Sequence, residues 1–258
     1  MIERKFGRLR SFDERSWNFM VRKQLAEGLE PKTTYWECSK VLDQLDTPRC
    51  VGYSGAHELI AIPVPIMRID AKDADVFYSG AQDEDQWPGS DYDGSSILGM
   101  ARWFIKVGFW EAVYWAFSFD DWKLGISHYG PALIGITWRS GMMEPDSNGF
   151  IHVTGSSLGG HAILANGYDH ELKRWTLHNS WGREWGLNGE CYVSDDDMNK
   201  SREDAAECAF AQGEKDIGDI PPPDPGNGGC AIANWFTRSG NGVARLLGSR
   251  YRVKAYKG

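Results

Sequence analysis

The sequence predicts an α+β fold, with helices in the first half of the chain and strands in the second. Residues 48–62 and 97–107 have the apolar spacing and the end residues that are typical of helices. Residues 132–138 form an apolar, strand-like run, and two further strand-like runs lie on either side of a turn at Asp169–His170, the first with His161 and the second ending at Asn179.

The N-terminal part begins with residues 1–32, which we expect to form an extended arm with one short helix around residues 15–26. Thr47 and Pro48 are typical helix-start residues. The helix that they start therefore has Cys50 in its first turn, where free backbone N–H groups and the helix dipole favour a thiolate.

The middle of the chain contains an acidic segment, residues 66–93, which we expect to be loop-like because Gly80, Pro88 and Gly89 interrupt it. The following helix ends at Gly108. The later segments are predicted as a short strand plus a helix (111–130), a glycine-rich loop (155–160), and a strand that runs into a surface turn (191–197).

Composition excludes several classes of protein. The net charge of −8 argues against general binding to nucleic acid, which needs a basic surface. The N-terminus lacks the apolar run of a secretory signal, and no segment approaches the ~20 apolar residues of a membrane span. The five cysteines are widely and irregularly spaced, which fits neither a disulfide framework nor a zinc site. We therefore expect a cytoplasmic protein with no membrane contact, no metal and no cofactor.

The C-terminal part changes character after the last predicted strand. Residues 216–230 are a Pro/Gly-rich linker, and residues 231–258 carry six Arg or Lys residues and no acidic residue. This basic tail could fold back, bind an acidic protein partner, or simply be solvated, and solvation is the simplest interpretation. We therefore expect the main domain to comprise residues 33–215, between the N-terminal arm and the linker.

Three residue types together point to nucleophilic catalysis. His161 and Asn179 lie near the ends of adjacent predicted strands, where an asparagine amide can orient an imidazole. A lone Cys50 or a lone His161 is more often a structural residue than a catalytic one. A cysteine at a helix start, a histidine on a strand and an asparagine after the next strand are instead typical of a thiolate–imidazolium pair.

The motifs around these residues resemble the papain-like cysteine peptidases over about residues 33–212. They are Gln44 six residues before Cys50-Val51-Gly52-Tyr53-Ser54, then Gly160-His161-Ala162, and Asn179-Ser180-Trp181-Gly182 followed by Trp185-Gly186. The resemblance is closest to short bacterial and bacteriophage members, which share the nucleophile loop Cys50-Val51-Gly52 and a segment like Asp93-Gly94-Ser95-Ser96. Only 49 residues precede Cys50, too few for a pro-segment in addition to the usual N-terminal arm, so we expect no pro-segment. It implies a two-lobed fold, with Cys50 on a helical lobe and His161 and Asn179 on an antiparallel β-rich lobe. A member from a phage would act in the host cell or the virion.

The resemblance also implies roles for individual residues. Cys50 would be the nucleophile, His161 the general base and acid, and Asn179 the group that orients the imidazole. The Trp181 ring would shield the bond between His161 and Asn179, and the Gln44 amide would donate to an oxyanion. Gly94, Ser95 and Gly160 would lie along the bound polypeptide substrate.

The chain departs from the family pattern in ways that leave the catalytic groups intact. Val51 replaces the tryptophan that usually follows the nucleophile, and Thr47 replaces a disulfide cysteine. His161 and Asn179 follow Cys50 by 111 and 129 residues, which indicates shortened loops relative to the usual ~130–150. These changes affect substrate preference rather than chemistry. Two alternatives stay open: an amidase or acyltransferase that uses the same thiol, and a non-catalytic phage structural or binding module.

Overall fold

The computed structural model describes residues 3–89 and 91–223 and confirms the α+β class. Its helices are α1 (Cys50–Ile60), α2 (Ala71–Glu84), α3 (Ile97–Val107), α4 (Phe119–His128) and α5 (Asp195–Glu203), with 3-10 turns η1 (Glu14–Asn18), η2 (Val21–Gln24) and η3 (Ser140–Met142). Its strands are β1 (Thr34–Tyr35), β2 (Ala112–Trp115), β3 (Ala132–Arg139), β4 (Ser157–Asp169), β5 (Arg174–His178), β6 (Glu190–Ser194) and β7 (Glu207–Gln212).

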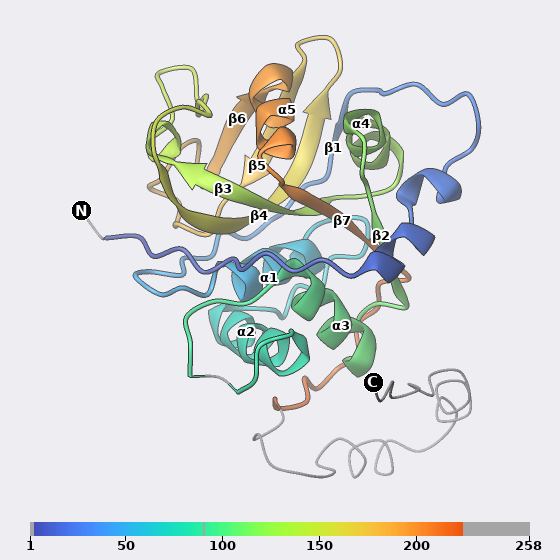
Figure 1. Ribbon diagram of the computed structural model, residues 1–258, viewed down its shortest axis with the longest axis vertical. Helices are drawn as coiled ribbons and strands as arrows, with labels where there is room; N and C mark the ends of the chain where they lie inside the picture. The colour runs from blue at the N-terminus through green and yellow to red at the C-terminus, as the bar shows by residue number, and fades with distance from the viewer. Residues whose placement is uncertain (1–2, 90, 224–258) are drawn as a thin grey trace, which may run out of the picture. The chain divides into compact units, whose positions relative to one another are not determined.

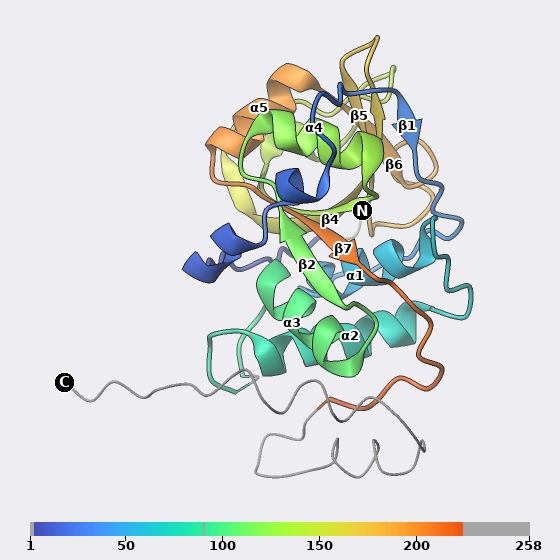
Figure 2. The same cartoon turned by 90° about the vertical axis from the view of Figure 1, so that its right-hand side faces the viewer.

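The strands form one antiparallel sheet in the order β2-β7-β3-β4-β5-β6, and β1 pairs with the far end of β4. Helices α1, α2 and α3 form a layer on one side of this sheet, whereas α4 and α5 lie on the other side (Figures 1 and 2). The two-lobed arrangement expected from the sequence is therefore present. The first residue of α1 and the middle of β4 meet where the lobes join.

Each lobe has its own hydrophobic core, and β3 contributes to both because successive side chains of a strand face opposite ways. Leu133 packs with the helices of the first lobe. Ile134, Ile136 and Trp138 pack against the second core, which includes Trp122 of α4. Between these positions, Gly135 leaves the helical side of β3 without a side chain.

Helix α3 begins and ends where the sequence predicts. The hydroxyl of Ser96 accepts a hydrogen bond from the backbone N–H of Gly99 and so caps the first turn. Gly108 ends the helix in the left-handed conformation, at φ 95°. The strand and helix predicted within residues 111–130 are β2 and α4.

The prediction of a loop over residues 66–93 was wrong, because α2 occupies its centre. Asp70 accepts from the N–H groups of Lys72 and Asp73, and the Asp73 side chain accepts from the Asp70 N–H, which forms a capping box. The buried residues Ala74, Phe77, Tyr78 and Ala81 have helical spacing. The high proportion of acidic residues on the solvent side concealed this pattern.

Three further elements differ from prediction. The surface turn expected after residue 194 is helix α5, capped by the Ser194 hydroxyl, which accepts from the N–H of Asp197. Strand β4 begins at Ser157, inside the segment expected as a glycine-rich loop. The short helix expected near residues 15–26 is instead the pair of 3-10 turns η1 and η2.

The end of the described chain packs on the helical lobe, where Ile217 and Ile220 contact the core. The basic tail expected at residues 231–258 lies outside the described residues. Within the described part, no helix combines the length and apolar character that crossing a membrane requires. Cys38, Cys50, Cys191 and Cys208 are all free thiols and buried.

Candidate active site

Cys50 is the first residue of α1, so it lies at the helix start that the sequence predicts. Its side chain is fully buried. All residues of α1 are buried, because the helix lies between α2, α3 and the sheet. The thiol is therefore held on a rigid element at the boundary between the lobes.

His161 lies on β4 and Asn179 directly follows β5, which pairs with β4. The Oδ1 atom of Asn179 lies 2.8 Å from Nε2 of His161 and also accepts a hydrogen bond of 2.9 Å from the Ser180 backbone N–H. A backbone N–H can only donate, so this second bond identifies the atom facing His161 as the amide oxygen. The other ring nitrogen of His161, Nδ1, has no hydrogen-bond partner.

Two tryptophans enclose the bonded pair. The ring of Trp181 lies 5.3 Å from the His161 ring, and the ring of Trp138 lies 4.8 Å from it in an edge-on contact. Both tryptophans are almost fully buried, so water is kept from the bond between His161 and Asn179. The sequence indicated Trp181 but not Trp138, whose place on β3 reads as an ordinary core position.

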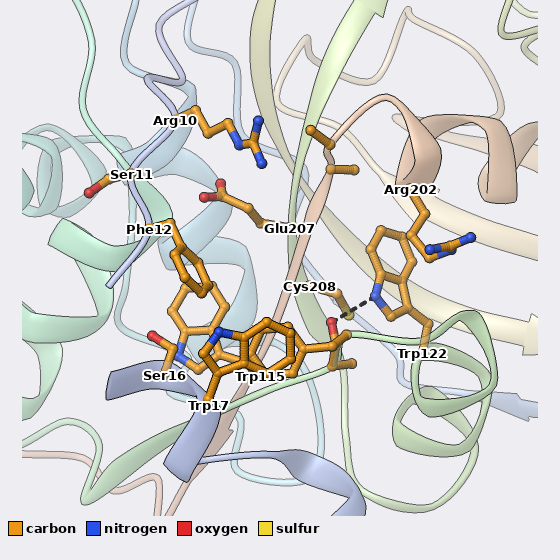
Figure 3. Close-up of a pocket in the computed structure, with 14 residues that line it drawn as sticks. Arg10, Ser11, Phe12, Ser16, Trp17, Trp115, Trp122, Arg202, Glu207 and Cys208 are labelled. Carbon is orange, nitrogen blue, oxygen red and sulfur yellow. Dashed lines mark hydrogen bonds between the residues drawn. The ribbon is translucent and has the colours of Figure 1, made fainter. Parts of the chain in front are cut away.

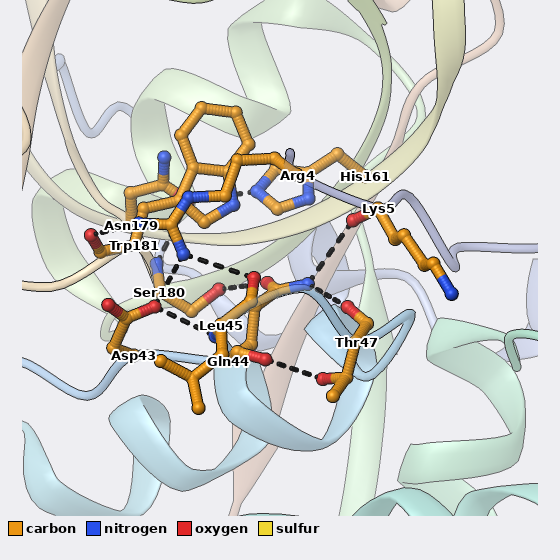
Figure 4. A network of polar contacts seen from close by, with 10 residues as sticks. All are labelled: Arg4, Lys5, Asp43, Gln44, Leu45, Thr47, His161, Asn179, Ser180 and Trp181. Carbon is orange, nitrogen blue, oxygen red and sulfur yellow. Dashed lines mark hydrogen bonds and ion pairs between the residues drawn. The ribbon is translucent and has the colours of Figure 1, made fainter. Parts of the chain in front are cut away.

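Gln44 connects the loop before α1 to the lobe that carries His161 (Figure 4). Its amide nitrogen donates to the carbonyl of Thr47 at 2.7 Å and to that of Lys5 at 3.3 Å. Its amide oxygen accepts from the Ser180 hydroxyl at 2.6 Å. Ser180, which sequence reasoning did not single out, thus orients the side chain expected to stabilise an oxyanion.

The N-terminal arm lies beside these residues. Within it, residues 4–9, which we call the blocking segment, run in an extended conformation between Ser95 and Gly160. The Ser95 N–H donates to the Gly7 carbonyl at 2.8 Å, and the Leu9 N–H donates back to the Ser95 carbonyl at 2.7 Å. The Arg8 N–H donates to the Gly160 carbonyl at 2.8 Å. The backbone groups of Ser95 and Gly160, which were expected to hold a substrate, are therefore bonded to residues of the N-terminal arm. The sequence did not predict this position of the arm.

Side chains hold the blocking segment against the candidate catalytic residues. The Phe6 ring makes edge-on contacts with the rings of His161 and Trp181, at 5.9 and 6.2 Å. Gly7 lies so close to the loop before α1 that an added Cβ would be 1.7 Å from the Pro48 carbonyl oxygen. Arg4 donates to Asp43 at 2.6 Å (Figure 4). The fit leaves no room for a second peptide at this place.

Burial under the segment changes the titration of both reactive groups. It raises the pKa of the Cys50 thiol, although nearby backbone N–H groups of Ala162, Gly7 and Val51 favour the thiolate. Burial also lowers the pKa of His161 to about 4, against the opposite effect of its bond to Asn179. The thiolate–imidazolium pair expected from the sequence is thus disfavoured in this form, because water is excluded from both groups.

Comparison with known proteins finds similarity in part of the sequence. Residues 115–212 match the family described as papain family cysteine protease. A cathepsin B-like cysteine proteinase 4 from Caenorhabditis elegans is 36% identical over 63 residues, which cover 24% of this chain and 19% of that protein. A cathepsin B-like cysteine proteinase from Schistosoma japonicum is 36% identical over 66 residues, which cover 25% and 19%. The matched segments thus span about a fifth of these curated relatives.

Solved structures extend the likeness to most of the fold. Xylellain, a cysteine protease from Xylella fastidiosa, superimposes with a TM-score of 0.56 at 16% identity. The superposition covers 83% of this chain and 99% of xylellain. Digestive procathepsin L 3 from the midgut of Tenebrio molitor larvae gives a TM-score of 0.54 at 14% identity, covering 73% and 72%. Residues 115–212 thus match the papain family of cysteine proteases, and most of the chain shares the fold of these solved proteases.

Proposed function

We propose that this protein is a cysteine peptidase that hydrolyses peptide bonds with Cys50, His161 and Asn179. The observation that carries the proposal is the blocking segment. An extended peptide is held there by backbone hydrogen bonds to Ser95 and Gly160, next to the thiol and the imidazole. A surface that already fits a peptide favours peptide substrates over small amides.

In the proposed first step, the Cys50 sulfur attacks the substrate carbonyl carbon, and the carbonyl oxygen becomes an oxyanion. The Gln44 amide and the Cys50 backbone N–H donate to that oxyanion; losing one such donor typically lowers turnover by ~10²–10³. The Lys5 carbonyl now accepts from the same Gln44 amide, at 3.3 Å. The segment therefore uses the donor that the transition state would need.

His161 transfers the protons. Its Nδ1 is free of other partners, so it can take the thiol proton and pass it to the leaving amine as the C–N bond breaks. In the second step, water attacks the thioester carbon and gives its proton to the same nitrogen. The carboxylic acid product leaves, and the Cys50 thiol is restored.

The form with residues 4–9 in place is, on this proposal, latent. A substrate can bind only if it displaces the blocking segment or if proteolysis has already removed that segment from the protein. Displacement would bring water to Cys50 and His161, which would lower the pKa of the thiol and raise that of the imidazole. The ion pair would then form only in the open state.

The test is labelling with an epoxide-type thiol-peptidase inhibitor, followed by mapping of the modified cysteine. It is run on the full chain, on Cys50→Ala, and on Cys38→Ser as a control that removes a different buried thiol. The proposal expects modification at Cys50 alone and cleavage of a denatured protein by the full chain and by Cys38→Ser, but not by Cys50→Ala. Cleavage by Cys50→Ala at the parent rate would refute it, and transfer of the acyl group to added amines instead of water would favour an acyltransferase.

A further inference from the structure

Helix α2 holds part of the backbone that pairs with the blocking segment. The Tyr78 hydroxyl accepts a hydrogen bond of 2.8 Å from the Gly94 N–H. The Gln82 amide donates to the carbonyls of Tyr92 and Gly94, at 3.0 and 3.1 Å. We call residues 92–95, which include these groups, the binding strip. Positions 78, 82 and 85 are four and three residues apart, so Asp85, which follows the last residue of α2, continues the same face.

Asp85 ties two residues of the binding strip to the end of α2. Its carboxylate accepts from the Tyr92 hydroxyl at 2.8 Å and from the Ser95 hydroxyl at 2.7 Å. It also accepts from the Trp87 N–H at 3.0 Å. Hydrogen bonds from hydroxyl groups to a carboxylate are among the stronger ones in proteins. One carboxylate therefore fixes both ends of the strip.

The position of Asp85 does not favour the helix itself. A negative charge at the C-terminal end of a helix opposes the helix dipole. Arg102 of α3 offsets part of this cost, because it donates to the Glu84 carbonyl at 3.3 Å. Lys106 pairs with the Glu84 side chain at the same end. A carboxylate kept at an unfavourable helix end points to a role outside the helix.

Ser95 carries the effect of Asp85 to the peptide that the strip binds. Ser95 is fully buried, because its hydroxyl faces Asp85 while its backbone faces the blocking segment. Its N–H donates to the Gly7 carbonyl at 2.8 Å, and its carbonyl accepts from the Leu9 N–H at 2.7 Å. A glycine at position 95 could offer the same backbone groups, but it could not bond to Asp85.

We propose that Asp85 is a positioning residue for the peptidase reaction, and that it holds the Ser95 backbone in place for the substrate through the Ser95 and Tyr92 hydroxyls. The inference rests on the proposed peptidase function and adds a residue that does not touch the substrate. The hydrogen bonds of Asp85 described above go to the strip and to Trp87 and not to the residues that carry the chemistry. Asp85 therefore acts on substrate binding, and its loss raises KM while kcat is kept.

The blocking segment uses the same strip, so the experiment must separate its attachment from that of a substrate. The arm has further contacts of its own. Arg8 donates to Glu207 at 3.0 and 2.7 Å, and residues 10–12 line a cavity of about 320 Å³ (Figure 3). A weakened strip therefore loosens the segment without freeing the whole arm. Gly7→Ala, in which the new Cβ cannot fit, removes the segment from the strip.

The experiment measures KM and kcat for acetyl-Leu-Ala-aminomethylcoumarin in the Gly7→Ala chain, with and without Asp85→Asn. Asparagine keeps the shape of the side chain but loses its charge and one acceptor oxygen. We expect KM to rise about tenfold and kcat to stay within about twofold. Asp91→Asn, the loss of a charge on an exposed residue next to the strip, should change neither constant. An unchanged KM, or a loss of kcat as large as the rise in KM, would overturn the assignment.

The two hydroxyls test the route by which Asp85 acts. Tyr92→Phe and Ser95→Ala each remove one bond to the carboxylate, so each should raise KM about threefold. Added to Asp85→Asn, neither should raise KM much further, because the bond is already weakened. Effects that multiply would show that Asp85 does not act through these hydroxyls.

If no variant hydrolyses the peptide, the peptidase proposal fails, and the role of Asp85 is judged by alkylation of Cys50 with iodoacetamide. In the chain with Gly7, Asp85→Asn should speed this reaction about threefold, because the blocking segment loses part of its support. Asp91→Asn should react at the parent rate. The buried thiols Cys38, Cys191 and Cys208 should stay unreactive, which excludes general unfolding. Equal rates at Cys50 in the parent and Asp85→Asn would reject the role of Asp85.

Discussion

The Asn179 amide oxygen lies 2.8 Å from Nε2 of His161, while Nδ1 of the same ring has no hydrogen-bond partner. An amide oxygen can only accept, so the neutral ring carries its proton on Nε2. The lone pair on Nδ1 is then free to take a proton. One hydrogen bond therefore sets both the tautomer and the orientation of the candidate base.

Replacing Asn179 by alanine should lower kcat by about 10², because the imidazole loses the group that fixes its proton. KM should change little, since Asn179 is buried and contacts no part of the blocking segment that stands in the substrate position. Steady-state kinetics with a fluorogenic peptide would measure both constants. Asn199→Ala, on the partly exposed face of α5, is the control, because its side chain bonds only within that helix. An equal loss in both variants would contradict the assigned role.

Gly7→Ala should expel the blocking segment, because the new Cβ would meet the Pro48 carbonyl oxygen at 1.7 Å. We expect Cys50 to react with iodoacetamide roughly tenfold faster or more at pH 7, given an overpacking cost of about 1–3 kcal/mol. The matched control is Gly130→Ala, where an added Cβ has no neighbour within 4 Å. If the two variants react equally fast, the segment does not protect the thiol.

The closed form should also shift the pH dependence of Cys50 alkylation to higher pH than is expected for an activated thiol. The pKa of Cys50 is raised by burial, so the parent chain should alkylate slowly at pH 6 and faster as the pH increases. Gly7→Ala should react faster at pH 6, since exposure favours the thiolate. Mass spectrometry of the alkylated peptides would measure both profiles. Rapid reaction of the parent at pH 6 would show that the ion pair exists beneath the segment.

Two buried histidines should give the stability of the protein a maximum near pH 6.5. Burial lowers the pKa of His161 to about 4, so its stabilising effect is present above pH 6.5 and is lost as the pH falls. His178 behaves in the opposite way. Burial lowers its pKa, but hydrogen bonds to Cys38 and Glu190 outweigh that effect and raise the pKa to about 9. The contribution of His178 to the free energy of unfolding is complete below pH 6.5 and is lost as the pH rises through about 9.

Each histidine should change the free energy of unfolding by about 3 kcal/mol over its range. Urea unfolding between pH 4 and pH 9.5 would measure this. His161→Gln should flatten the acid side of the profile and His178→Gln the alkaline side. These assignments would be contradicted if His161→Gln flattened the alkaline side of the stability profile or if His178→Gln flattened the acid side. His57, whose pKa burial also lowers, keeps part of the acid dependence in His161→Gln.

Asp70→Ala should destabilise the protein by about 1 kcal/mol, because it removes the side chain that caps α2. For a domain of this size, the midpoint of thermal unfolding should fall by roughly 2–4 °C. Asp120→Ala is a suitable control, since that side chain is 81% exposed on α4. A midpoint unchanged by Asp70→Ala would mean that solvent replaces the cap.

Local signals in the sequence were sufficient for several elements. Gly108 ends α3 because a glycine in the left-handed conformation acts on its own turn. The helix predicted after Thr47 and Pro48 begins at Cys50, although its N-cap Arg49 makes no side-chain cap hydrogen bond and the Thr47 hydroxyl donates to the Gln44 carbonyl instead. Helix α2 was missed although its capping box and its apolar spacing are also local. That error arose from giving acidic composition more weight than periodicity.

The sequence by itself predicted the fold class, and the motifs around Cys50, His161 and Asn179 stood out through their resemblance to a family, because each motif consists of residues that are neighbours in the chain. Only the tertiary structure decided that residues 4–9 lie beside Cys50 and that Arg8 meets Glu207, 199 positions away. The same holds for Trp138, whose ring contacts His161 across the second core. Such contacts depend on how two lobes close around one another, and no local periodicity of the chain records that closure.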